Sequence, residues 1–303
     1  MGAAATALCL ASLDWALGED DAAPNSAGTA IPRWIARAYI GLQLAATAWA
    51  ATLVAHHATL LEQIGLAVSA GILTGVFGFL AAHEMVHSRS PNERALGLLF
   101  LGSVFYMHFR IAHLYGHHRR AATIDDPATA RLGEGLYAFI LRSVVGQFRE
   151  AWVFEERRRR AIVGAGNRMI RYLSAQAIFL ITLALVSWRA LLFIVAIAAI
   201  AVALLESFNY VAHYGLSRGA DERLAPHHSW NSRRRMNNAA LFNMGRHSDH
   251  HRHTTRSYEA LEEVSAAAVL PAGYAGALLT ALIPPLWRTM MDPRAEAAMA
   301  ATS

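Results

Sequence analysis

Histidine is the residue type in this chain with the clearest capacity for chemistry, because nine of the fifteen histidines fall into four short stretches. The nine are His83, His87, His113, His117, His118, His213, His247, His250 and His251. Imidazole binds iron, zinc, copper and nickel, so the residue type alone does not name the metal. Since one zinc ion takes four ligands, a single zinc site would leave most of the nine histidines idle. Cys9 is the only cysteine, which excludes a thiolate site and a fused iron–sulfur electron donor.

The spacing within these stretches suits pairs of ligands on one helix face. Residues four positions apart project from the same side of an α-helix. We therefore expect three two-ligand units: His83 with His87, His113 with His117, and His247 with His251. His118 and His250 point roughly a quarter turn away from their neighbours, so they can serve a second ion.

Carboxylates are expected beside such a cage, because imidazoles carry no negative charge to balance metal cations. Four lie in or just after the histidine stretches: Glu84, Asp125, Asp126 and Asp249. Each could accept the second ring N–H of a ligand and so fix its tautomer. For Asp125 and Asp126 the alternative is that they start a turn before Pro127.

Glu206 is a carboxylate inside an apolar run, where a charge is expensive and often functional. Glu206, Asn209 and His213 follow one another at i, i+3 and i+7, so we expect them on one helix face toward the metals. The alternative is a structural hydrogen bond from Glu206 to another helix. With Asp249, Glu206 and Asn209 are the candidate residues that assist catalysis.

The composition indicates a membrane protein. Hydrophobic residues make up 55% of the chain and charged residues 16%, which leaves too much apolar surface for a water-soluble globule. All 27 basic residues are arginines, and most lie between the apolar runs, as in a membrane protein with a fixed orientation. A basic face with stacking aromatics is not visible, so nucleic-acid binding is not expected.

Four segments are long enough to cross a hydrocarbon core, which needs roughly 20 apolar residues. They span about 34–55, 63–82, 170–188 and 190–210. Residues 1–17 are expected to form a short or truncated first helix, and residues 18–33 a polar linker. The predicted fold is an all-α, integral-membrane helical bundle with a histidine-rich cap, in one domain of residues 1–303.

The four segments form two close hairpins, so the histidines at the ends of both hairpins are expected on one membrane face. Arginines precede the second hairpin: Arg157 to Arg160, Arg168 and Arg171. The positive-inside bias makes that face cytoplasmic. These arginines could also attract a small acidic electron carrier. Residues 95–109 suit a re-entrant or half-buried helix. Residues 264–287, interrupted by prolines, suit an interfacial cap over the bundle.

Two features of the first hairpin could shape a substrate channel. Gly71, Gly75 and Gly78 could leave room for a slender chain, or they could permit close helix packing. Trp49 could stop such a channel, or it could face lipid as an interfacial aromatic.

The histidine stretches and their surroundings resemble the membrane alkane 1-monooxygenase family and its xylene monooxygenase relatives. The resemblance runs from about Ala81 to Arg294 and includes GHHRRAATIDDPATAR, RSVVGQFREAW, NYVAHYGL, LFNMGRHSDHH and LPAGYAGALLTALIPPLWRTMMDP. Membrane desaturases share three histidine stretches, whereas the HYG group and the LPxGY…PPLW tail are typical of the hydroxylases. Ala112 and Ala212 stand where the family often carries glutamate.

The resemblance implies that the nine histidines bind two iron ions. It implies an O2-dependent hydroxylase that removes a hydrogen atom from an unactivated C–H bond and returns a hydroxyl group. Substrates would be apolar: the terminal methyl of an alkane or the methyl of an alkyl aromatic. Electrons would come from rubredoxin or a ferredoxin-type donor and its reductase. The protein would lie in the bacterial inner membrane, with its active site on the cytoplasmic side.

Three other functions stay open at this point. A fatty acid desaturase or lipid hydroxylase would use similar histidine stretches on another substrate. A membrane zinc protease would use His83, Glu84 and His87, with Glu84 as the base, but this leaves seven histidines unexplained. A heme or metal carrier would bind metal without turning over O2.

Overall fold

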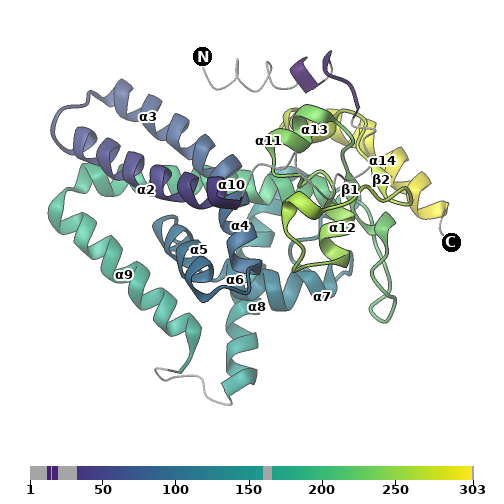
Figure 1. Ribbon diagram of the computed structural model, residues 1–303, viewed down its shortest axis with the longest axis horizontal. Coiled ribbons are helices and arrows are strands. Elements are labelled where there is room, and N and C mark those ends of the chain that lie inside the picture. Colours follow the sequence, from purple (N-terminus) through teal and green to yellow (C-terminus); the bar gives the residue numbers. More distant parts are fainter. Residues whose placement is uncertain (1–11, 15, 20–32, 160–165, 302–303) are drawn as a thin grey trace. The chain divides into compact units, whose positions relative to one another are not determined.

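The computed structural model describes residues 12–14, 16–19, 33–159 and 166–301. Nearly all regular secondary structure in these residues is helical, in agreement with the predicted all-α membrane fold (Figure 1). Most of the helix expected at residues 1–17, and most of the linker expected at 18–33, lie outside the described residues. The chain separates into two compact units, which are described one at a time. Unit 1 comprises residues 1–31, 116–146 and 206–303, and unit 2 comprises residues 32–115 and 147–205.

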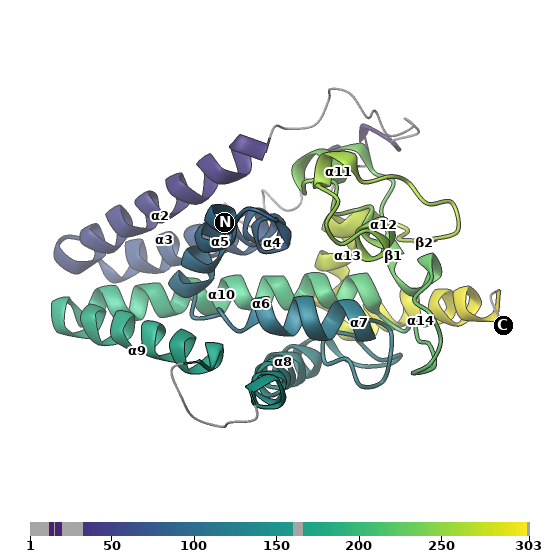
Figure 2. The same ribbon diagram turned by 60° about the horizontal axis from the view of Figure 1, so that its bottom comes forward.

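Unit 2 is built from helices that carry the apolar segments. Its elements are α2 (Arg33–His56), α3 (Leu60–Leu73), η1 (Thr74–Gly78), α4 (Phe79–His87), α5 (Pro91–Ser103), α6 (Phe109–Ile111), α9 (Arg168–Val186), most of η2 (Ala112–His117), and parts of α8 (Leu136–Arg159) and α10 (Trp188–His213). The helices α2 and α3 run side by side (Figures 1 and 2). Small and branched side chains of α2, α3 and α10, such as Val54, Ala67 and Ile197, form its buried core.

Four described helices are long and apolar enough to cross a membrane, as the sequence predicts. They are Trp34–His56, Leu60–His87, Arg168–Val186 and Trp188–His213. The second continues through α3, η1 and α4, so His83 and His87 lie within the helix and not after it. At about 1.5 Å per residue, its 28 residues measure about 42 Å, longer than a hydrocarbon core of about 30 Å. The histidine end can therefore reach beyond the core.

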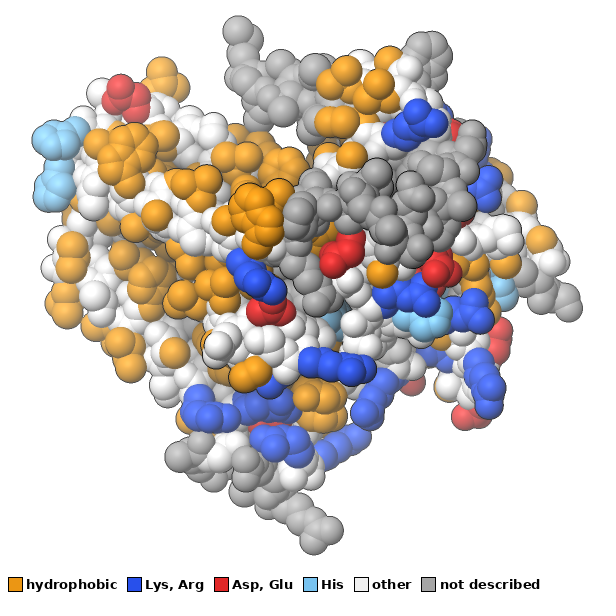
Figure 3. Space-filling view, viewed as in Figure 1, with side chains coloured by type: hydrophobic (Ala, Val, Ile, Leu, Met, Phe, Trp, Pro, Cys, Tyr) orange, Lys and Arg blue, Asp and Glu red, His pale blue; other side chains and the backbone are white. Residues whose placement is uncertain are grey.

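The outer surface of these helices is apolar. Leu61 is 80% exposed and Leu185 is 83% exposed, which suits contact with lipid chains. Figure 3 shows hydrophobic side chains spread over the region of α2 and α3. Trp49 is 63% exposed on α2, so the structure favours the lipid-facing alternative over the channel stop.

The glycines of the first hairpin allow close helix packing. A Cβ atom on Gly71 would lie 2.8 Å from Cβ of Ile200, and one on Gly75 would lie 2.8 Å from Cδ1 of Leu204. Both neighbours belong to α10. A Cβ atom on Gly78 would lie 2.6 Å from the ring of Phe100. The space beside these glycines is thus filled by neighbouring side chains, so the packing alternative holds and the glycines open no channel.

The variant Gly75→Val should destabilise unit 2. The added side chain must displace Leu204 and the backbone of Ala201, and overpacking of this kind costs about 1–3 kcal/mol. Thermal unfolding in detergent, followed by loss of helical circular dichroism, measures the effect. Gly65→Val is the matched control, because nothing lies within 4 Å of a Cβ atom at that position. Equal unfolding temperatures for the two variants would contradict the prediction.

The arginines before the second hairpin are partly engaged within unit 2. Glu155 is fully buried and accepts hydrogen bonds from Arg158 Nε at 2.7 Å and from Arg168 Nη2 at 2.6 Å. Burial alone would raise the pKa of Glu155, but these two guanidinium groups lower it to about 2. Arg157 and Arg171 remain exposed, and Arg160 lies outside the described residues. The expected acidic carrier would therefore meet fewer of these charges than the sequence suggests.

One of two sequence expectations about shorter segments needs correction. The helix expected at 95–109 begins at Pro91, where Ser90 caps it, and ends at Ser103. A turn with Phe105 at a φ of 56° interrupts the chain before α6. The stretch 264–287 is interrupted as expected, because α13 (Gly273–Ala281) ends before Pro284, which begins α14 (Pro284–Ala300), a position that suits its fixed φ.

Unit 1 is made of short elements around a core of buried aromatic side chains. Its elements are α7 (His118–Arg120), η3 (Pro226–His228), β1 (Trp230–Asn231), α11 (Arg235–Ala240), α12 (His247–Arg252), η4 (Tyr258–Ala260), β2 (Ala268–Val269), α13 (Gly273–Ala281), α14 (Pro284–Ala300), the first part of α8 and the last part of α10. The strands β1 and β2 pair in parallel. Trp230 Nε1 donates to the carbonyl of Tyr214 at 2.9 Å, and Tyr274 Oη donates to the carbonyl of Trp230 at 2.9 Å. These bonds fix β1 beside the end of α10.

Candidate metal centre

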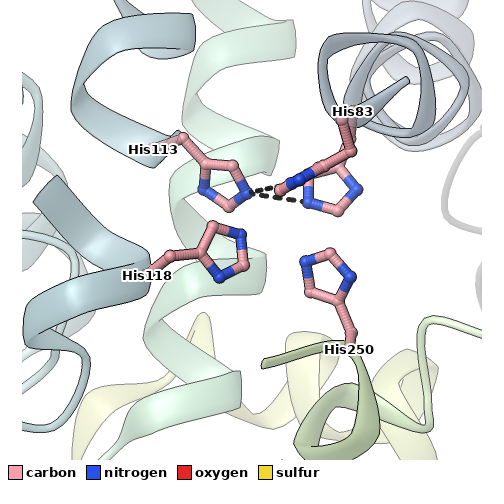
Figure 4. Close-up of side chains that lie close together, drawn as sticks. His83, His113, His118 and His250 are labelled. Carbon is pink, nitrogen blue, oxygen red and sulfur yellow. Dashed lines mark hydrogen bonds between the residues drawn. The ribbon is translucent and has the colours of Figure 1, made fainter. Parts of the chain in front are cut away.

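Three of the predicted ligands come together within unit 2. His83 and His87 lie one turn apart on α4, and His113 lies in η2. The Nε2 atom of His113 is 2.8 Å from that of His83 and 3.0 Å from that of His87. Figure 4 shows the rings of His83 and His113 directed toward each other. The three Nε2 atoms therefore converge on one point.

Local backbone geometry and aromatic packing position these three rings. Both histidine stretches adjoin π-helical turns, η1 before His83 and η2 around His113, and such turns are frequent at functional sites. The ring of His113 stacks on that of Phe109, with centroids 4.7 Å apart and planes at 18°. Phe79 packs edge-on against Phe109 at 6.3 Å. The sequence pattern revealed neither the π-helical turns nor the role of Phe109.

Four further ligands converge within unit 1. They are His117, His213, His247 and His251, and all four are buried. The Nε2 atom of His247 lies 3.1 Å from that of His213 and 3.1 Å from that of His251. The ring of His117 completes the group, 4.9 Å from the rings of His213 and His251. With a metal–nitrogen bond of about 2.1 Å, two ligands at right angles would lie about 3 Å apart, close to these spacings.

The partner of the second ring nitrogen, Nδ1, indicates which nitrogen of a ring carries the hydrogen. A carbonyl can only accept, so His213 must carry its hydrogen on Nδ1, which donates to the carbonyl of His228 at 3.2 Å. His247 Nδ1 lies 3.4 Å from the thioether of Met244. Burial lowers the pKa of His251 well below its usual value, which keeps that ring neutral. Nε2 of His213 therefore presents a lone pair to the neighbouring rings, an arrangement that a metal cation would stabilise.

Two of the expected histidine pairs lie together in the structure, and the third pair does not. His83 lies with His87, and His247 lies with His251, as predicted. His113 belongs to the group in unit 2, whereas His117 belongs to the group in unit 1. The contacts of each ring explain why His113 and His117 separate. Phe109 stacks on His113, whereas Asp126 accepts a hydrogen bond from His117.

His118 and His250 stand apart from their neighbours in sequence, as their helical positions predict. Both belong to unit 1, but neither is a member of its four-histidine group. Their ring centroids lie 4.9 Å apart, and Figure 4 shows the two rings side by side. His118 and His250 are therefore available for a different ion from the one that the four-histidine group suits.

Asp126 is the carboxylate that orients one of the predicted ligands, His117. It is 1% exposed, and it accepts hydrogen bonds from His117 Nδ1 at 2.8 Å and from Thr129 Oγ1 at 2.7 Å. Its Oδ1 also accepts from the amide of Ala128, so the expected turn at Pro127 forms as well. Burial alone would raise the pKa of Asp126, but His117 and the hydrogen bonds lower it. Asp125 is exposed and takes no such part.

Asp249 has other partners than the sequence suggests. It is buried and accepts from His253 Nδ1 at 2.9 Å, from Arg256 Nη1 at 2.8 Å and from the amide of Glu262 at 2.9 Å. None of these three groups belongs to a predicted ligand. Asp249 lies in α12 together with His247 and His251, and it therefore fixes the chain that follows this helix.

Glu206 forms a hydrogen bond to another helix, which was the alternative to a position facing the metals. Its Oε2 accepts from Ser143 Oγ of α8 at 2.6 Å and from Asn209 Nδ2 at 3.2 Å. The carboxylate is fully buried within unit 1. Glu206 and Asn209 thus tie α10 to α8, one to two turns before His213.

Comparison with known proteins agrees with this fold and site. The sequence model of the fatty acid desaturase family matches residues 62–280. Alkane 1-monooxygenase 2 of Pseudomonas aeruginosa is 35% identical over 305 aligned residues, which cover 94% of this chain and 81% of that protein. An alkane 1-monooxygenase of Pseudomonas putida is 40% identical over 243 residues, which cover 77% of this chain and 60% of that protein. The xylene/toluene monooxygenase hydroxylase component XylM of Pseudomonas putida is 31% identical over 238 residues, which cover 75% and 63%.

The apolar helices, the converging histidines and the family match define a membrane oxidoreductase of the fatty acid desaturase type. Within this class, the chain belongs to the alkane 1-monooxygenase family.

Proposed function

We propose that this protein holds two iron ions on nine histidines and hydroxylates an unactivated C–H bond of an apolar substrate with O2. The four imidazoles that converge in unit 1 give this proposal its main support, because such a group suits a divalent metal ion. The remaining five of the nine histidines complete the proposed ligand set. When bound, the iron pair would supply the activation of O2.

The proposed substrate is the terminal methyl of an alkane or the methyl of an alkyl aromatic. The relatives named above, an alkane monooxygenase and a xylene/toluene monooxygenase component, support this class. Ala112 and Ala212 precede the ligands His113 and His213, and both are buried, at 1% and 3% exposure. Alanine at both positions places no carboxylate directly before those ligands.

The chain's own residues hold and orient the proposed ligands. Asp126 holds the hydrogen on Nδ1 of His117, which leaves Nε2 as the donor to metal. Glu206 and Asn209 position the end of α10 that carries His213. Asp249 positions the chain that follows α12. In this proposal Glu206, Asn209 and Asp249 act through the ligands and not on the substrate.

We propose that electrons reach the site from rubredoxin or a ferredoxin-type donor and its reductase. The donor would act at the cytoplasmic face of a bacterial inner membrane. The arginines near the end of α8 support this orientation, because positive charge favours the cytoplasmic side. Figure 3 shows basic side chains gathered near that end of α8.

Incubation of membranes with donor, reductase and ¹⁸O2 tests the proposal. The substrate panel contains alkanes, alkyl aromatics and fatty acids of several lengths. We expect an alcohol that carries one ¹⁸O atom, and purified protein with two irons per chain. An alkene product would instead indicate a desaturase. One zinc without iron would indicate a protease, and bound metal without O2 consumption a carrier.

A further inference from the structure

The loop between α10 and β1 carries a network of polar side chains, which we call the loop clip: Arg218, Glu222 and His228. Arg218 Nε donates to the carbonyl of Ala121 at 2.8 Å, and its Nη2 donates to that of Arg119 at 2.9 Å. Its Nη1 donates to the carbonyl of Glu222. One guanidinium group therefore joins the chain that follows His118 to the chain that follows His213, within unit 1.

The clip also holds a strained turn. Ala122 has a φ of 65°, a conformation that a residue with a side chain rarely adopts. The amide of Arg218 donates to the carbonyl of Ala122 at 2.8 Å, and the amide of Ala122 donates to Thr129 Oγ1 at 2.8 Å. These bonds hold the turn that begins three residues after His118.

His228 is the buried end of the clip. Its Nδ1 accepts a hydrogen bond from the amide of Ala225 at 3.0 Å, so in the neutral ring the hydrogen lies on Nε2. That Nε2 faces a carboxylate oxygen of Glu222 at 3.5 Å, and the other oxygen accepts from the amide of Gly219 at 3.0 Å. The side chain of His228 is fully buried.

His227, His228 and Glu222 lie close enough together to suggest a third metal site. The hydrogen bonds of His228 argue against it. A ring that accepts an amide hydrogen on Nδ1 has a hydrogen, and not a lone pair, on Nε2. His228 instead acts through its main chain, since its carbonyl accepts the hydrogen from Nδ1 of His213 at 3.2 Å.

We propose that the loop clip positions two ligand stretches at once: it holds the carbonyl of His228 that fixes the tautomer of His213, and it holds the turn after His117 and His118. This inference rests on the proposed function, because it assigns these histidines to metal. The clip residues are positioning residues. Side chains that orient a ligand in this way typically contribute 10–100-fold to metal affinity or activity.

Iron binding by His228 variants tests this proposal without relying on turnover. His228→Leu removes the hydrogen bond that His228 accepts from the amide of Ala225 and leaves the bonds of Arg218 in place, whereas His228→Asn keeps an acceptor that can reach that amide. We expect His228→Leu to lose one of two irons about 10–100-fold faster to a chelator, and its Mössbauer spectrum to change for one iron only. His228→Asn should recover most of the loss. His227→Leu is the matched control and should behave like the wild type.

Each other outcome has a distinct meaning. Wild-type protein with two irons, together with a His228→Leu variant that holds both as tightly, would overturn the clip alone. If the wild type held a third metal ion that both His227→Leu and His228→Leu lost, the result would overturn the clip in favour of a metal site at these two histidines. Wild-type protein that binds no iron would overturn the proposed function and, with it, the clip. Glu222→Gln, a milder change at a half-exposed side chain, should shift iron loss in the same direction if His228→Leu fails to fold.

Discussion

The variant His247→Ala should lose the ion proposed for unit 1 and nearly all hydroxylation. His247 is the central member of its group, because its Nε2 lies 3.1 Å from the Nε2 atoms of both His213 and His251. Loss of a side chain that only orients a ligand costs 10–100-fold, so loss of a ligand should lower activity more than about 100-fold. Iron per chain, measured by mass spectrometry, and alcohol formation check this result.

His57→Ala is the control for that experiment. His57 is an exposed histidine of unit 2 that belongs to neither histidine group, so both irons and full activity should remain. Two irons and wild-type activity in His247→Ala would contradict the assignment of the four-histidine group.

The variant Asp126→Asn should weaken metal binding while it preserves the shape of the site. The carboxylate accepts the hydrogen of His117 Nδ1, whereas an amide nitrogen in its place would donate and favour the other tautomer. His117 would then carry its hydrogen on Nε2, where the metal should bind. We expect a 10–100-fold loss of metal affinity. Titration of the metal-free protein with Fe(II) measures the change.

Asp125→Asn is the matched control, because Asp125 is the exposed neighbour of Asp126. Its affinity for iron should equal that of the wild type. An Asp126→Asn variant with unchanged affinity would show that the hydrogen bond to His117 does not decide the tautomer.

The membrane helices and the ligand pairs were the most predictable parts of this protein. Hydropathy summed over some 20 residues locates a membrane span, because the gain or loss of one apolar side chain changes the transfer free energy of the whole segment little. The pairs on α4 and α12 followed from helical spacing, which holds wherever the backbone is α-helical. The same rule failed for His113 and His117, where the chain is π-helical and the partner of each ring decides its group.

The environment of the ligands was less predictable, because it depends on contacts between distant residues. Proximity in sequence favoured Asp125, Asp126 and Asp249 alike, yet only Asp126 meets a ligand ring. The partner of Glu206 is Ser143, 63 positions earlier. No local pattern reveals that the carbonyl of His228 accepts from His213.

The burial of the four-histidine group has a consequence for how the enzyme matures. Its members are at most 7% exposed, so an ion among them would be shielded from bulk solvent. Iron would then enter most readily while the chain is still assembling in the bilayer, or during local unfolding of unit 1. Cells starved of iron during synthesis should therefore accumulate protein that later addition of iron restores only slowly.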